Sequence, residues 1–184
     1  SALYKALIEQ TTTTDMSAEQ IHRIGLDEVA RVRHDMLAIK DKVGFRGTLR
    51  EFFDHLRTDP QFKFASKQAL LDGYNAIRVR VDAAVPKLFS LIPKSPFEIR
   101  PVPAYSEQNE AAGSYRQGTP DGTRPGIFFV NTYDLPSRTT PGMETLFLHE
   151  AIPGHHFQIA LAQETEALPH FLRFNGNTAF VEGW

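Results

Sequence analysis

Residues 149–156, with the sequence HEAIPGHH, concentrate three imidazoles and one carboxylate within eight positions. They follow an apolar stretch at residues 143–148, and a second acidic residue, Glu182, comes 26 positions after His156. A hydrolytic zinc site needs two or three neutral imidazoles, often a carboxylate ligand, and a further carboxylate that takes the proton of the attacking water. Residues 149–156 and Glu182 supply all these groups.

The spacing of these histidines differs from the common zinc-peptidase motif His-Glu-x-x-His, in which two imidazoles four residues apart share one face of a helix. The fourth residue after His149 is Pro153. On a regular helix His155 would lie roughly 240° around the axis from His149, and His156 about 20° from its face but about two turns away. Because Pro153 interrupts a helix and Gly154 tolerates unusual backbone angles, we expect a broken helix that brings one of the two histidines back towards His149.

The segment HEAIPGHHFQ, with FVEGW after it and RPGIFFVNTYDLP before it, resembles a bacterial family known as domain of unknown function 885. The similarity runs from about Gly44 to Trp184, and HEAIPGHH and EGW are its most specific parts. The family is similar to a divergent branch of the zincin metallopeptidases. The resemblance therefore implies a zincin-like metal helix.

The resemblance also implies a role for each polar residue. The His-Glu pair of a zincin would make His149 the first ligand and Glu150 the general base. Its Gly-His pair would make His155 the second ligand, and the Glu on its later helix would make Glu182 the third. Two extra residues separate the pairs here, so His156 stays open as the second ligand or as a neighbour of the metal site.

The function expected from these residues is a zinc-dependent hydrolase, a metallopeptidase acting on peptide or small amide bonds. Zn²⁺ lowers the pKa of a bound water from near 15.7 towards about 7, and Glu150 would accept its proton. Two histidines and a carboxylate also suit non-haem iron, so an iron oxygenase is a competing chemistry. A second interpretation is a noncatalytic binding or structural module, in which the same residues form a buried network with or without a structural metal.

Composition narrows the range of possible functions. The chain has 184 residues, of which 41% are hydrophobic, enough to bury one core. A net charge of -2 lacks the basic excess of nucleic-acid binding, and without cysteine any metal must be held by His and carboxylate. No run approaches the roughly 18 apolar residues of a membrane span. A periplasmic or secreted location, including lipid anchoring of a longer protein, is favoured over the cytoplasm, and the oligomeric state is undetermined.

The expected fold is mainly α with a small antiparallel β-sheet (α+β), as one fragment of a larger domain, because Trp184 falls inside what should be a helix. Residues 1–92 are predicted to be helical, 93–139 to form a β-hairpin and loop, and 140–184 to form the metal-binding helices. Capping boxes at Ser17 and Thr48 should begin the first two helices, and Ser66 a third that ends near Leu88. Alternation predicts strands at 97–102 and 126–132.

Two further expectations concern the surroundings of the metal helix. Thr140 and Pro141 are predicted to be its N-cap and first residue. In zincins a sheet edge pairs with the extended substrate, so strand 126–132 is a candidate substrate platform, with a plain core hairpin as the alternative. The candidate substrate-binding residues are Phe129, Asn131, Tyr115 and Arg124.

Overall fold

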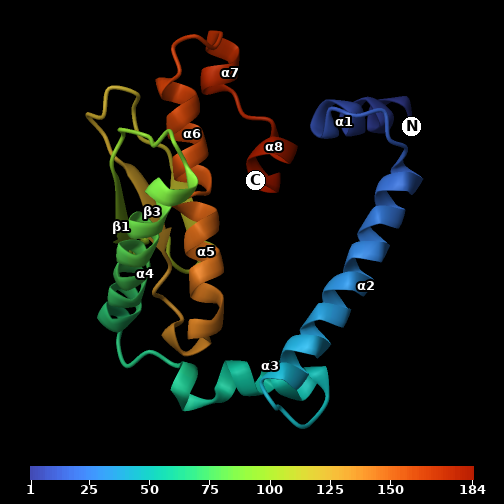
Figure 1. Cartoon of the computed structure of the whole chain (residues 1–184), viewed down its shortest axis with the longest axis vertical. Coiled ribbons are helices and arrows are strands. Elements are labelled where there is room, and N and C mark those ends of the chain that lie inside the picture. Colours follow the sequence, from blue (N-terminus) through green and yellow to red (C-terminus); the bar gives the residue numbers. More distant parts are fainter. The chain divides into compact units, whose positions relative to one another are not determined.

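The computed structural model describes every residue from Ser1 to Trp184 (Figure 1). The chain divides into two compact units, one made of Ser1–Leu56 with Asn177–Trp184 and the other of Arg57–Gly176. Helices predominate beside a single three-stranded sheet, so the predicted α+β class is confirmed. The segment boundaries expected at residues 92 and 139 stay a prediction. None of the helices combines the length and the apolar character needed to cross a bilayer.

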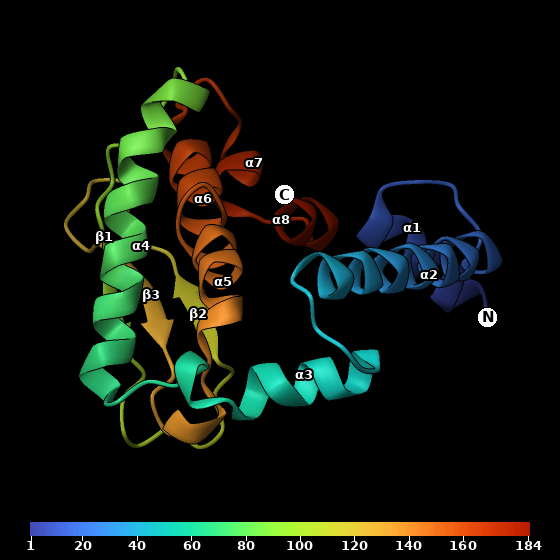
Figure 2. The ribbon, with the colours of Figure 1, turned by 60° about the horizontal axis from the view of Figure 1, so that its bottom comes forward.

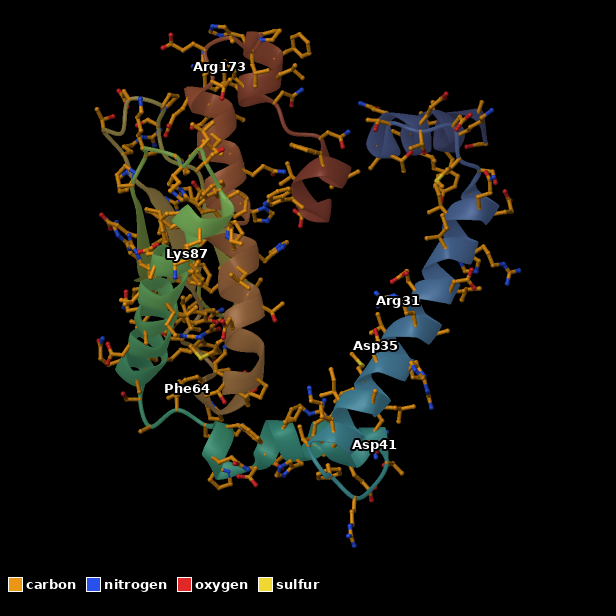
Figure 3. The ribbon with its side chains drawn as sticks, viewed as in Figure 1. Arg31, Asp35, Asp41, Phe64, Lys87 and Arg173 are labelled. Atoms are coloured by element: carbon orange, nitrogen blue, oxygen red, sulfur yellow. The ribbon has the colours of Figure 1, made fainter.

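The first unit consists of helices. They are α1 (Ala2–Thr12), α2 (Ala18–Lys42), most of α3 (Leu49–Thr58) and α8 (Thr178–Gly183). The capping boxes predicted at Ser17 and Thr48 are both present. On the exposed face of α2, Arg31 bridges the carboxylates of Glu28 and Asp35 (Figure 3). Helix α1 is absent from the expectations because it has no buried face, and periodicity therefore has nothing to reveal.

The second unit contains the sheet and the remaining helices. In chain order its elements are the 3₁₀ turn η1 (Pro60–Phe62), α4 (Lys67–Leu88), β1 (Phe97–Pro101), β2 (Gly113–Arg116), β3 (Gly126–Val130), the 3₁₀ turns η2 (Leu135–Ser137) and η3 (Thr140–Gly142), α5 (Met143–Glu150), α6 (His155–Glu164) and α7 (His170–Phe174). The predicted helix from Ser66 to Leu88 is therefore confirmed as α4, whose N-cap is Ser66.

The sheet has the strand order β1-β3-β2. β1 and β3 are parallel, with Phe97 opposite Gly126, whereas β2 and β3 are antiparallel, with Tyr115 opposite Phe128. The predicted antiparallel pairing of strands 97–102 and 126–132 is therefore wrong. β2 supplies the antiparallel pair, and its four residues are too few to show the alternation that identifies a strand.

The central position of β3 also decides the question of the substrate platform. A strand can accept an added peptide only along an edge whose backbone N–H and C=O groups are not already used. Both edges of β3 are paired, one with β1 and the other with β2. The prediction that residues 126–132 form such a platform is wrong for this reason.

Helices α4 and α5–α6 cover the same face of the sheet (Figure 2). Phe128 of β3 is completely buried there and makes edge-on contacts with Tyr74 of α4, at 5.1 Å between ring centroids, and with Phe147 of α5, at 6.1 Å. Close packing of this kind leaves little freedom to shift. The end of α5, which carries the histidine and glutamate of the HEAIPGHH segment, is thus placed by the core.

The start of α5 differs from the expectation. Thr140 and Pro141 lie in η3, and α5 begins only at Met143, with Gly142 in the N-cap position and no side-chain cap. The prediction that Thr140 caps this helix is wrong. Proline fixes φ at a value that also suits a 3₁₀ turn, so the same residue types can begin either structure.

Candidate metal centre

The helix is broken between Glu150 and His155, as the Pro-Gly pair predicts. α5 ends at Glu150 and α6 begins at His155. Between them Ala151 has φ −108° and ψ −97°, Gly154 has φ −78° and ψ −135°, and the Ile152–Pro153 peptide bond is cis. These backbone angles are far from helical values, so the helical hydrogen-bond pattern is interrupted between α5 and α6.

Gly154 allows the start of α6 to lie against the last turn of α5. A Cβ atom at position 154 would lie 1.9 Å from the carbonyl oxygen of His149 and 2.3 Å from that of Leu148. No side chain fits at such distances, because the obstructing atoms belong to the backbone of a packed helix. The glycine therefore makes the close approach of the two helices possible.

The break brings His149 and His155 together. Their ring centroids are 4.3 Å apart, in an edge-to-face arrangement, and one ring nitrogen of each lies within 4.8 Å of the other. Both residues are half-buried. Imidazole nitrogens are common metal ligands, and these two histidines, together with a glutamate carboxylate, could hold a metal ion.

Glu150 lies next to this pair. The residue is only 7% exposed, and its Oε2 atom is 4.0 Å from Nε2 of His155. The charge of Glu150 also acts on the phenol of Tyr74. Burial raises the pKa of Tyr74 to about 12, the charge of Arg138 opposes this rise, and the charge of Glu150 adds to it. A buried carboxylate at this position can accept a proton from a water molecule beside His155.

His156 points elsewhere. It is 2% exposed, its Nδ1 lies 2.9 Å from the hydroxyl of Tyr115, and its ring packs on Phe97 with centroids 4.7 Å apart. Burial lowers the pKa of His156 to about 4, although a hydrogen bond with the backbone of Ser95 acts in the opposite direction. The structure therefore places His155 beside His149 and places His156 against the sheet.

Glu182, the third expected ligand, lies on α8. Its helix is capped by Asn177, whose side-chain oxygen accepts a hydrogen bond from the backbone N–H of Phe180 at 3.2 Å. The amide nitrogen of Asn177 also donates to the carbonyl oxygens of Gln10 and Thr11 at the end of α1, at 3.4 and 3.3 Å. These contacts fix α8 within the first unit, and the assignment of Glu182 as a ligand stays a prediction.

The four candidate substrate-binding residues have intramolecular contacts of their own. Phe129 is covered by the guanidinium of Arg116, 4.7 Å from the ring centroid. Asn131 is buried and donates to the carbonyl oxygens of residues 107 and 110, at 2.7 and 2.9 Å. Tyr115 contacts His156, and Arg124 is exposed in the loop between β2 and β3. Their role towards a substrate stays a prediction.

One group of contacts near the histidines has no signal in the sequence. The carboxylate of Glu164, at the end of α6, accepts hydrogen bonds from the backbone N–H groups of Lys94 and Ser95, at 2.8–3.0 Å. Arg173 of α7 donates to the carbonyl oxygen of Gln163 beside it, at 3.1 Å (Figure 3). Partners that are 70 residues apart, as Glu164 and Lys94 are, cannot be paired by spacing alone.

Comparison with known proteins gives a family and a structural likeness. All of the chain, residues 1–184, matches the family model described as "Bacterial protein of unknown function (DUF885)". The chain is similar to the crystal structure of the putative lipoprotein from Colwellia psychrerythraea, with 34% sequence identity and a TM-score of 0.93. The match covers 100% of this chain and 32% of the other, so the chain spans about a third of that protein's length. No curated protein matches the chain.

Proposed function

The chain belongs to the DUF885 family of bacterial proteins of unknown function, and we propose that it carries the catalytic core of a zinc-dependent hydrolase of peptide or small amide bonds. One observation carries the proposal: the rings of His149 and His155 meet at 4.3 Å across a break in the helix, with the Glu150 carboxylate 4.0 Å from His155. Two imidazoles and a buried carboxylate at one place are the groups that metal-assisted hydrolysis requires.

In this proposal His149, His155 and Glu182 hold one Zn²⁺ ion. Two histidines and one carboxylate are a known catalytic zinc set and leave the fourth position open. Zinc accepts four-coordinate sites of His and carboxylate more readily than iron or manganese does, which supports it as the metal. When bound, such an ion lowers the pKa of water towards about 7 and polarises a carbonyl group. The ligand set is the one implied by the likeness of this family to the zincins.

Glu150 acts as the general base in the proposed reaction. It follows His149 directly, ends α5, and is held almost completely out of solvent beside His155. Its carboxylate takes the proton from the attacking water and passes it to the leaving amine. Its burial strengthens its interaction with any charge that develops nearby, because less water is present to screen that charge.

A location outside the cytoplasm agrees with this activity. The crystal structure to which the chain is similar is that of a putative lipoprotein. We extend this to the present chain as part of the proposal, so that the full-length protein is periplasmic or secreted and held by a lipid anchor. Peptides outside the cytoplasm are then its substrate class.

The decisive experiment compares Glu150→Gln with the unchanged full-length protein. Glutamine keeps the shape of glutamate but cannot accept a proton, so the variant should retain its zinc, measured by elemental analysis. Its hydrolysis of a peptide library should fall by about 10²-fold or more. His149→Ala should lose both the metal and the activity. Glu166→Gln, which changes an exposed glutamate just beyond α6, is the matched control and should change neither.

Two other outcomes would replace the proposal. Purified protein without bound metal, together with no peptide cleavage by any variant, would support a noncatalytic module. Bound iron in place of zinc, with consumption of oxygen, would support an oxygenase instead.

A further inference from the structure

Two consecutive residues of α6 have opposite surroundings. His155 and His156 are neighbours in the first turn of the helix, so their side chains project about 100° apart. The ring of His155 lies 4.3 Å from the ring of His149, measured between centroids. The ring of His156 is buried between Phe97 and Tyr115. The direction of one side chain therefore determines the direction of the other, provided that the helix is regular.

The buried ring of His156 is held by one polar and one aromatic contact. The hydroxyl of Tyr115 lies 2.9 Å from Nδ1, within hydrogen-bond distance. The ring of Phe97 packs against the imidazole with 4.7 Å between the centroids. A hydrogen bond is directional, so the contact with Tyr115 constrains the orientation of the imidazole ring.

The other end of the same helix is also held. Glu164, nine positions after His155, accepts three backbone hydrogen-bond contacts from Lys94 and Ser95, at 2.8–3.0 Å. α6 therefore has a polar contact with β2 in its first turn, through His156 and Tyr115, and with the residues just before β1 in its last turn. Two separated ties of this kind oppose rotation of the helix about its axis.

We infer that His156 is a positioning residue, which sets the rotation of α6 through its contacts with Tyr115 and Phe97 and thereby directs His155 towards His149. The inference rests on the proposed metal site, because it gives His155 its role. The inference explains why the chain has two consecutive histidines although only His155 lies beside His149. His156 itself touches neither the metal nor the substrate.

The geometry shows why rotation matters. Side-chain atoms of a helix lie about 6 Å from its axis, so a rotation of about 20° moves the ring of His155 by about 2 Å. Metal–ligand distances tolerate changes of only about 0.2 Å. The apolar contacts of α6 could persist through a rotation of this size. The same rotation would nevertheless move His155 too far to bind the ion.

The experiment distinguishes an effect on the orientation of His155 from an effect on stability. It uses two single variants and the double variant, all made in the full-length protein. Tyr115→Phe and His156→Phe each leave one buried polar group without its partner, which should lower both the melting temperature and the zinc affinity. The double variant replaces both partners with apolar rings, so its melting temperature should return towards that of the parent. Its zinc affinity, measured by competition with a chelator, should stay about tenfold lower, because the directional contact is still missing.

Two further variants complete the comparison. His156→Asn keeps an acceptor near the position of Nδ1 and should recover most of the affinity. Phe157→Leu, which weakens the apolar contact of α6 with Phe89 at 4.9 Å, is the matched control. It should lower the melting temperature while changing zinc affinity by less than about threefold, because no polar tie is lost.

A crystal structure of the metal-free double variant gives a readout that needs no zinc. The rings of His149 and His155 should lie farther apart than 4.3 Å, with α6 turned about its axis. Recovery of both melting temperature and affinity in the double variant, or an unchanged ring distance, would overturn the inference. If the parent protein binds no zinc, the proposed function fails. The distance between the rings of His149 and His155 then decides by itself whether His156 orients His155.

Discussion

At position 154 the carbonyl oxygen of His149 occupies the space that a side chain would need. Gly154→Ala would place a methyl group 1.9 Å from this oxygen, and α6 would have to move away from α5. We expect the free energy of unfolding to fall by about 3 kcal/mol, as in other severe overpacking, and zinc binding to be lost. Denaturant unfolding and metal analysis of the full-length variant measure the two effects.

The control for this change is another glycine to which an added methyl group would do no harm. Gly25 lies inside α2, and nothing is within 4 Å of a Cβ built there. Gly25→Ala should raise stability by about 0.5–1 kcal/mol, because alanine is the better helix former. Equal behaviour of the two variants would contradict the role assigned to Gly154.

Two phenols, buried Tyr74 and half-buried Tyr115, predict how stability depends on alkaline pH. Burial raises the pKa of both Tyr74 and Tyr115 to about 12. An unfolded tyrosine releases its proton near pH 10, whereas the folded state keeps it up to about pH 12, so raising the pH through this interval favours unfolding. The free energy of unfolding should therefore fall from pH 10 to pH 12, and less steeply in Tyr115→Phe.

Absorbance of the ionised phenol follows the same titration directly. The folded protein should show two tyrosines that ionise near pH 12, and only one of them in Tyr115→Phe. Tyr105→Phe provides the control for removal of a hydroxyl group, because Tyr105 is 89% exposed.

At the scale of the elements, α8 depends on one side chain. Asn177 caps the helix through Phe180 and reaches the carbonyl oxygens at the end of α1. Asn177→Ala should remove the cap, at a cost of about 1 kcal/mol, and amide hydrogens of α8 should exchange faster with solvent. The amides of α4, in the other unit, serve as an internal reference whose exchange should not change.

Asn177→Asp distinguishes the two functions of this residue. Aspartate still accepts the hydrogen bond of the cap but cannot donate to Gln10 and Thr11. Protection of α8 should therefore survive while that of the last turn of α1 decreases. If both helices lose protection equally, the cap and the tie to α1 are not separable.

The elements also show which local signals are strong. Capping boxes mark the starts of α2 and α3 because the two hydrogen bonds of each box lie within four residues. Strand β2 and helix α1 lack such signals: one has four residues, and the other has no buried face. Their formation depends on partners elsewhere in the chain.

At the scale of the whole molecule, metal should contribute to stability. A ligand that binds only the folded state stabilises it by about 2.7 kcal/mol when present at 100 times its dissociation constant. Treatment of the full-length protein with a chelator should therefore lower its melting temperature, and added zinc should restore it. The His149→Ala variant should have the same melting temperature with and without chelator. If the melting temperature of the parent protein is also unchanged by chelator, the protein has no stabilising metal.

The sequence by itself determined the local features of this protein. Pro153 and Gly154 predicted the break in the helix, because one residue cannot donate a backbone hydrogen bond and the other has no side chain to clash. The HEAIPGHH and EGW motifs indicated the family, and the helical periodicity indicated the α+β class. Each of these depends on residues that are close together in the chain.

The tertiary structure alone decided which histidine faces His149 and how the strands pair. His156 contacts Tyr115, which lies 41 residues before it in the chain. β1 pairs in parallel with β3, whose other edge is paired with β2. Helical periodicity fixes the angle between neighbouring side chains but not the direction in which the helix faces, because that direction is set by contacts with distant parts of the chain.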